Sequence, residues 1–96
     1  MSEDERALFV RAEGQVQGVS YRAFTQEQAA QLGIHGWVVN RDDGSVEAVL
    51  HGPGAKLGEL ITRMRQGPPA AKVDGLDVRS TDRGRISDVP DGAVTF

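Results

Sequence analysis

Apolar and polar residues alternate over several short stretches of the chain, a pattern typical of half-buried strands. In residues 7–13, for example, Leu8, Val10 and Ala12 fall on one face. We predict strands, in chain order, over residues 7–13, 34–40, 45–51, 73–79 and, briefly, 93–96. The fourth strand is interrupted by the turn-forming residues 74–75.

Two other segments carry apolar residues at helical spacing. In residues 21–32, Tyr21, Phe24 and Leu32 lie on one stripe, and Gly33 follows as a stop signal. The second helix is marked by Leu57, Leu60, Ile61 and Met64, and it ends at the run Gly67-Pro68-Pro69.

The order of these elements predicts an α+β fold. Strand, helix, strand, strand, helix, strand is the ferredoxin-like βαββαβ arrangement, in which two helices cover one face of a mainly antiparallel sheet. A short extra strand is added at the C-terminus. A right-handed crossover makes the first two strands parallel and places the third between them. The loop after the first strand and the end of the second therefore lie at one edge of the sheet, about 10 Å apart.

Composition bounds the function. A chain of 96 residues with 39% hydrophobic and 26% charged residues predicts a single domain over residues 1–96, of which 1–5 are expected to fray. The net charge of −3 argues against nucleic-acid binding. The absence of cysteine excludes disulfides and thiol catalysis. Without a signal peptide or an apolar span, we expect a cytoplasmic monomer with no membrane partner.

The loop of residues 14–20 is the first candidate site. It joins a strand to a helix N-terminus, where free backbone N–H groups and the helix dipole attract anions, and Gly14 and Gly18 let the chain turn its amides inward. On the glycines alone, an ordinary connecting loop is the better interpretation. Arg22 changes the balance, because a cation in the first helical turn is unfavourable unless an anion lies beside it. With Arg22 included, an anion site and a solvated arginine are equally supported.

Asn40 is the second candidate, at the end of the second predicted strand. Asparagine is common beside turns, where it bonds to its own backbone. The topology nevertheless brings Asn40 to the same edge as Arg22. Its amide can donate and accept at once, which suits the orientation of a water molecule beside a bound phosphate.

The remaining polar residues give weaker signals. His35 and His51 have no spaced carboxylate partner and are interpreted as strand or surface histidines, and Asp42 and Asp43 as turn residues. The glycine loop matches neither a Walker A motif nor a dinucleotide fingerprint. We predict no metal site and no cofactor.

Two longer motifs resemble the signatures of the acylphosphatase family. GQVQGVSYR at residues 14–22 resembles the first signature, and GWVVN at 36–40 followed by DGSVE at 43–47 resembles the second. The resemblance covers the chain from Ala7 to Phe96. Val39 departs from it, because the family often has a basic or polar residue there, which could alter the surface charge near the site. Residues 83–92 are turn-rich and less characteristic.

The resemblance implies a metal-independent hydrolase that splits the carboxyl–phosphate bond of acyl phosphates into a carboxylate and inorganic phosphate. It implies that Arg22 clamps the phosphate and that Asn40 positions the attacking water. The loop residues Gln15, Val16, Gln17, Gly18 and Val19 would offer their backbone amides to the phosphate oxygens. The expected partners are a small acyl phosphate and inorganic phosphate, the latter as product and inhibitor.

Three alternatives stay open at this point. The same fold could serve a non-catalytic module that binds an anion or a protein. The chain could also be a piece resembling the acylphosphatase-like domain of larger carbamoyl-transfer proteins. RNA binding on the open sheet is the least supported alternative, because the aromatic strand signature is missing and the net charge is acidic.

Overall fold

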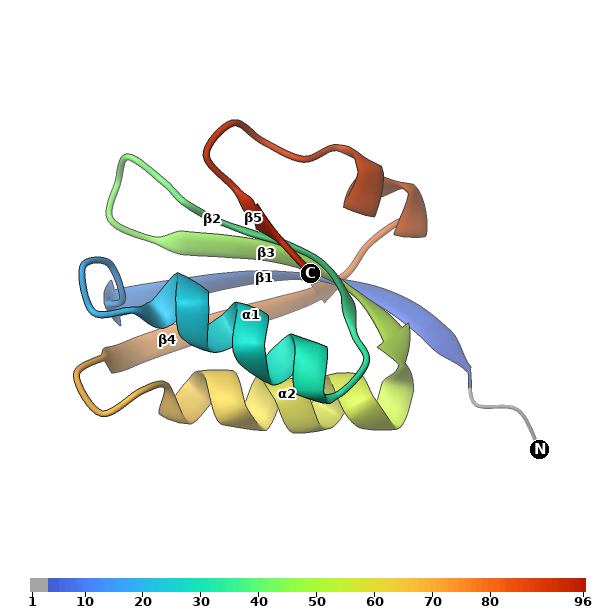
Figure 1. The fold of residues 1–96 in the computed structure, drawn as a ribbon, viewed down its shortest axis with the longest axis horizontal. Coiled ribbons are helices and arrows are strands. Elements are labelled where there is room, and N and C mark those ends of the chain that lie inside the picture. Colours follow the sequence, from blue (N-terminus) through green and yellow to red (C-terminus); the bar gives the residue numbers. More distant parts are fainter. Residues whose placement is uncertain (1–3) are drawn as a thin grey trace.

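The structure, a computed structural model, describes residues 4–96 and places two helices on one face of a five-stranded sheet (Figure 1). The strands are β1 (Glu5–Gln15), β2 (His35–Asn40), β3 (Val46–Pro53), β4 (Lys72–Ser80) and β5 (Val94–Thr95). The helices are α1 (Tyr21–Gln31), α2 (Gly54–Gln66) and the short 3₁₀ helix η1 (Arg83–Ser87). The strand order is β4-β1-β3-β2-β5, and neighbouring strands are antiparallel. The predicted ferredoxin-like fold is confirmed.

The register of the sheet brings the two candidate segments to the same edge. Ala12 of β1 pairs with Val46 of β3, and Val46 pairs with Asn40 of β2. Asn40 and Ala12 thus lie in one row, two strand spacings or about 10 Å apart. Figure 1 shows the loop after β1 and the β2–β3 turn at the same end of the sheet.

The main core lies between the sheet and the two helices. It includes Val10 and Leu50 from the sheet and Leu60 from α2, all fully buried. On α1 the buried residues are Tyr21, Thr25 and Ala29. Of the predicted stripe only Tyr21 is buried, whereas Phe24 and Leu32 are half-buried. Thr25 and Ala29 are small, so the helix can pack close to the sheet, while Tyr21 Oη donates a hydrogen bond to Met64 O of α2 (2.8 Å).

A second, smaller cluster lies on the opposite face of the sheet. Trp37, Val39 and Val49 are buried there, and Ile86 of η1 packs against them. Trp37 Nε1 also donates to Arg85 O (3.0 Å). Residues 83–92, predicted only as polar turns, therefore contain a short helix that covers part of this face. Val39 belongs to this cluster and does not line the pocket described below. Its effect on the surface charge near the site stays a prediction.

The edges of the elements differ slightly from the prediction. β1 begins at Glu5, which pairs with Pro53, so the expectation of a frayed start is wrong for that residue. Residues 1–3 lie outside the described residues. β4 is continuous, and the irregularity predicted at residues 74–75 appears as a bulge opposite Glu13 and Gly14, which leaves Asp74 without a partner in β1.

Candidate active site

A pocket of about 310 Å³ opens at the end of the sheet where β1 runs into α1. Its lining residues are Val16, Gly18, Ser20, Tyr21, Arg22, Ala23 and Asn40. The structure thus brings Arg22 and Asn40 into one cavity, as the topology predicted. A larger cavity of about 500 Å³ lies near the start of α2 beside Arg6, but it contains none of the candidate residues.

The loop leading to α1 keeps its backbone N–H groups free. Gly18 has φ +73° and Ser20 has φ +66°, so a non-glycine residue adopts a left-handed conformation immediately before the helix. The Ser20 hydroxyl does not cap α1. Within residues 4–96, no hydrogen bond engages the N–H groups of residues 16–20. Together with the dipole of α1, these donors form a site suited to an oxyanion.

The five predicted loop residues do not contribute equally. Val16 and Gly18 line the pocket. Gln15 ends β1 and pairs with Lys72, and Val19 packs against the main core. Gln17 does not line the pocket, and its side-chain amide donates hydrogen bonds to the β2–β3 turn.

Arg22 is held by a backbone carbonyl from a distant part of the chain. Its Nη1 donates to the carbonyl oxygen of Gly92, 2.8 Å away, in the loop before β5. None of the carboxylates in the described part of the chain lies within ion-pair distance of Arg22. Its positive charge beside the free amides of the loop is therefore available to an anion.

Asn40 stands at the last position of β2. Its Oδ1 atom is buried and has no hydrogen-bond partner among the described residues. A buried, unpaired acceptor is costly unless a ligand or a water molecule completes it. Asn40 thus combines an unpartnered acceptor with a place in the pocket that Arg22 also lines.

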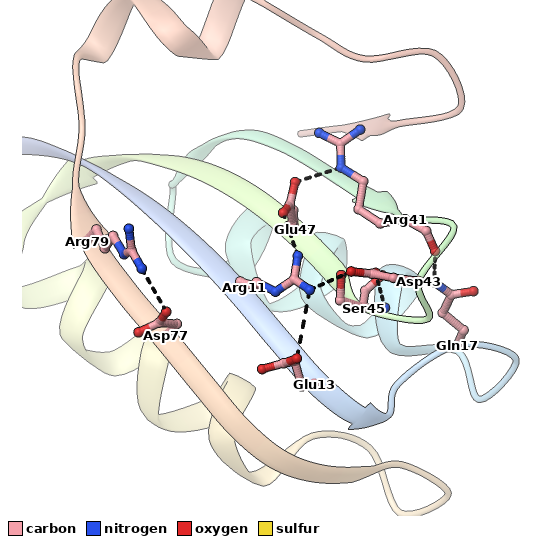
Figure 2. Close-up of polar contacts among 9 residues, drawn as sticks. All are labelled: Arg11, Glu13, Gln17, Arg41, Asp43, Ser45, Glu47, Asp77 and Arg79. Atoms are coloured by element: carbon pink, nitrogen blue, oxygen red, sulfur yellow. Dashed lines mark hydrogen bonds and ion pairs between the residues drawn. The ribbon is translucent and has the colours of Figure 1, made fainter.

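The turn between β2 and β3 is fixed by charged groups (Figure 2). Asp43 Oδ1 accepts from Ser45 N (3.0 Å) and Ser45 Oγ (2.6 Å), and Asp43 Oδ2 pairs with Arg11 Nη2 (2.5 Å). These bonds hold the pKa of Asp43 well below its usual range, chiefly through the Ser45 hydroxyl and N–H and then through Arg11. Glu47 joins the network by bonding to both Arg11 (3.0 Å) and Arg41 (2.6 Å). The interpretation of Asp43 as a turn residue is confirmed.

Two polar contacts made by residues beside the pocket were not found from the sequence. The carbonyl of Gly92 has no local signal, because any residue offers a carbonyl. The contacts of the Gln17 side chain were also missed. Its sequence signal was a polar amide between Val16 and Gly18, in a loop that was expected to bind through backbone N–H groups alone.

The two histidines lie away from the pocket. His35 of β2 pairs with His51 of β3 at the opposite end of β2 from Asn40.

In residues 4–96, no three His, Cys, Asp or Glu side chains form a group that could hold a metal ion. The same part of the chain contains no helix long and apolar enough to cross a membrane.

Comparisons with known proteins agree on one family. The family model described as Acylphosphatase matches residues 8–88. An acylphosphatase of Rhizorhabdus wittichii is 54% identical over 78 residues, which cover 81% of this chain and 79% of that protein. The match therefore extends over most of both chains.

Solved structures give the same answer. An acylphosphatase from Bacillus subtilis superimposes with a TM-score of 0.77 and 36% identity, covering 78% of this chain and 83% of that one. An acylphosphatase from Coxiella burnetii gives a TM-score of 0.79 and 32% identity, covering 82% and 83% respectively. The prediction of a hydrolase of the acylphosphatase type is confirmed by these relatives. The chain belongs to the acylphosphatase family, as its two motifs predicted.

Proposed function

We propose that the pocket between α1 and Asn40 binds the phosphoryl group of a small acyl phosphate and hydrolyses its carboxyl–phosphate bond. Arg22 and the backbone amides of the loop from Gln15 to Val19 hold the phosphoryl oxygens, with the free N–H groups of residues 16–20 as the main donors. Asn40 orients the attacking water. One observation supports this most strongly: Arg22, without an ion pair in residues 4–96, and the unpartnered Oδ1 of Asn40 share one pocket.

The chemistry needs few protein groups. The water oxygen attacks phosphorus while the bond from phosphorus to the carboxylate oxygen breaks, and the proton released by the water passes to the phosphate or to solvent. The leaving carboxylate is the base of an acid with a pKa near 4, so it departs without a general acid. Catalysis then rests on charge stabilisation by Arg22 and the amides and on placement of the water by Asn40.

The partners follow from this chemistry. The substrate is a small acyl phosphate, and inorganic phosphate is both product and competitive inhibitor, because it presents the same oxygens to the loop. We further propose a cytoplasmic monomer that needs no cofactor, nucleic acid or membrane, in keeping with the net charge of −3.

Release of phosphate from benzoyl phosphate in the presence of EDTA tests the proposal. We expect metal-independent turnover and competitive inhibition by phosphate, with related rates across a panel of small acyl phosphates. Binding of phosphate without turnover would show instead a non-catalytic anion-binding module. Turnover that requires an added metal would contradict the proposed mechanism.

A further inference from the structure

We propose that Gln17 is a positioning residue that fixes the anion loop against the turn following Asn40. Its Nε2 donates to Arg41 O (2.7 Å) and to Ser45 O (2.9 Å), so both hydrogens of one amide are used. This inference rests on the proposed function, because it assigns a role at the same pocket.

The two acceptors are brought together by the turn itself. Arg41 N donates to Ser45 O (2.8 Å), which closes the turn and leaves both carbonyl groups facing the loop after β1. Gln17 Nε2 donates to both oxygens, and Figure 2 shows its side chain directed at the Arg41 carbonyl. A single primary amide is thus bound to both ends of the turn.

The turn is a rigid support. Asp43 bonds to the N–H and hydroxyl of Ser45, and Arg11 pairs with Asp43 and with Glu47. Arg41 in turn pairs with Glu47 (2.6 Å). A chain of ion pairs thereby anchors the turn to β1 and β3, and Gln17 docks the loop on an element that is already fixed.

The loop needs such an anchor. Its N–H groups at residues 16–20 have no partners within residues 4–96 and are thus free for an anion. Ser20 is held in a left-handed conformation, which is unfavourable for a residue with a side chain. The neighbours of Gln17 in sequence, Val16 and Gly18, line the pocket, and so does Asn40, which immediately precedes Arg41 in the chain.

In the proposed reaction, Gln17 would fix the distance between the bound phosphoryl group and the attacking water. It joins the backbone that would hold the phosphoryl oxygens to the backbone that carries Asn40. Without its two hydrogen bonds, the loop and the turn could each keep their shape while the spacing between them varied. A shift of about 1 Å in such an arrangement is enough to lower the rate of an attack about 10²-fold.

The test compares Gln17→Met, which keeps the length of the side chain but removes both donors, with Gln66→Met at the exposed end of α2 as the control. We expect kcat for benzoyl phosphate to fall at least tenfold in Gln17→Met and to stay unchanged in Gln66→Met. Amide exchange and ¹⁵N relaxation should show greater motion of residues 16–20 in Gln17→Met alone. Gln17→Glu, which puts a carboxylate against the two carbonyls, should be at least as impaired as Gln17→Met.

A double-mutant cycle with Asn40→Ala separates positioning from general destabilisation. If Gln17 acts by holding Asn40 opposite the loop, Gln17→Met costs much less kcat in the Asn40→Ala background than in the wild type. Multiplicative losses, or a loop whose exchange is unchanged in Gln17→Met, would overturn the inference. If the wild type lacks turnover, the proposed function fails, whereas an active wild type with an equally active Gln17→Met variant refutes only the role of Gln17. A variant that does not fold is replaced by Gln17→Asn, whose shorter amide retains the donors but cannot reach both oxygens.

Discussion

Arg22 donates a hydrogen bond from Nη1 to the carbonyl oxygen of Gly92, 2.8 Å away and 70 residues later in the chain. This bond uses one of the five N–H donors of the guanidinium group and leaves the others for the pocket. The bond to Gly92 O therefore orients Arg22. None of the carboxylates in residues 4–96 pairs with its guanidinium group. Part of the conformational entropy of this long side chain is therefore lost on folding, and not when an anion binds.

Replacement of Arg22 by Lys should lower activity by about 10²-fold or more. Lysine keeps the charge, but it cannot bond to Gly92 O and at the same time offer a planar pair of donors to phosphoryl oxygens. The inhibition constant for phosphate should rise as well, in steady-state assays with benzoyl phosphate. Arg65→Lys, at an exposed position of α2, is the matched control and should behave as the wild type. Near-normal turnover in Arg22→Lys would rule out Arg22 as the clamp.

Gly92→Ala tests whether the carbonyl of residue 92 orients Arg22. Gly92 has φ +79°, and an added Cβ atom would meet nothing within 4 Å, so the substitution acts by backbone strain and not by a clash. The strain shifts the carbonyl, and we expect KM for benzoyl phosphate to rise several-fold with a smaller change in kcat. An unchanged KM would show that Arg22 keeps its position without this bond.

Gly58→Ala is the contrasting glycine substitution. Gly58 lies within α2, its φ is not positive, and an added Cβ atom would again meet nothing within 4 Å. Alanine is favoured over glycine inside a helix by about 1 kcal/mol. The free energy of unfolding, measured by urea denaturation, should therefore increase by up to this amount while kcat and KM stay constant. A loss of stability would show that α2 requires glycine at this position.

The parts of the fold that follow from local pattern were predictable from the sequence. The order of strands and helices, with a right-handed crossover, places Asn40 beside the loop that precedes Arg22. The missing parts are polar contacts between distant segments, such as Gln17 with Ser45 and Arg22 with Gly92. No periodicity encodes these contacts, because they depend on how two loops approach each other after the sheet has formed. The buried Thr25 was missed for a related reason, since close packing against the sheet overrides hydrophobicity.

Asp43 should make stability depend on pH in the acid range. Its pKa is lowered in the folded state, so its contribution to stability is present above the unfolded pKa, near 4, and is lost as the pH falls toward the folded value. The midpoint temperature of thermal unfolding, measured from pH 7 to pH 2, should thus decrease once the pH is lower than 4. Asp43→Asn should lower the midpoint slightly at pH 7, because solvent screens this exposed group, and should flatten the decline in acid.

Asp42→Asn is the control for this measurement. The described residues make no hydrogen bond or ion pair to the Asp42 side chain, although it is next to Asp43 in the same turn. Its midpoints should follow those of the wild type at every pH. If Asp43→Asn also follows the wild type, the bonds to Ser45 and Arg11 do not stabilise the fold.

Asn40→Ala separates the orientation of water from the binding of phosphate. Asn40 carries no charge, so it contributes little to holding a phosphate dianion in the ground state. If its buried Oδ1 atom orients the attacking water, its effect appears mainly as the reaction proceeds. We expect kcat to fall by about 10²-fold or more while competitive inhibition by phosphate changes little.

If Asn40 only shapes the turn, its replacement would instead cost about 1 kcal/mol of stability and leave kcat unchanged in the folded variant. Val78→Ala, which removes half-buried apolar contacts in β4 away from the pocket, supplies a destabilised control that should keep its kcat. Turnover, phosphate inhibition and thermal unfolding measured on both variants distinguish the two roles, and an unchanged kcat with a lowered midpoint in Asn40→Ala would remove Asn40 from the mechanism.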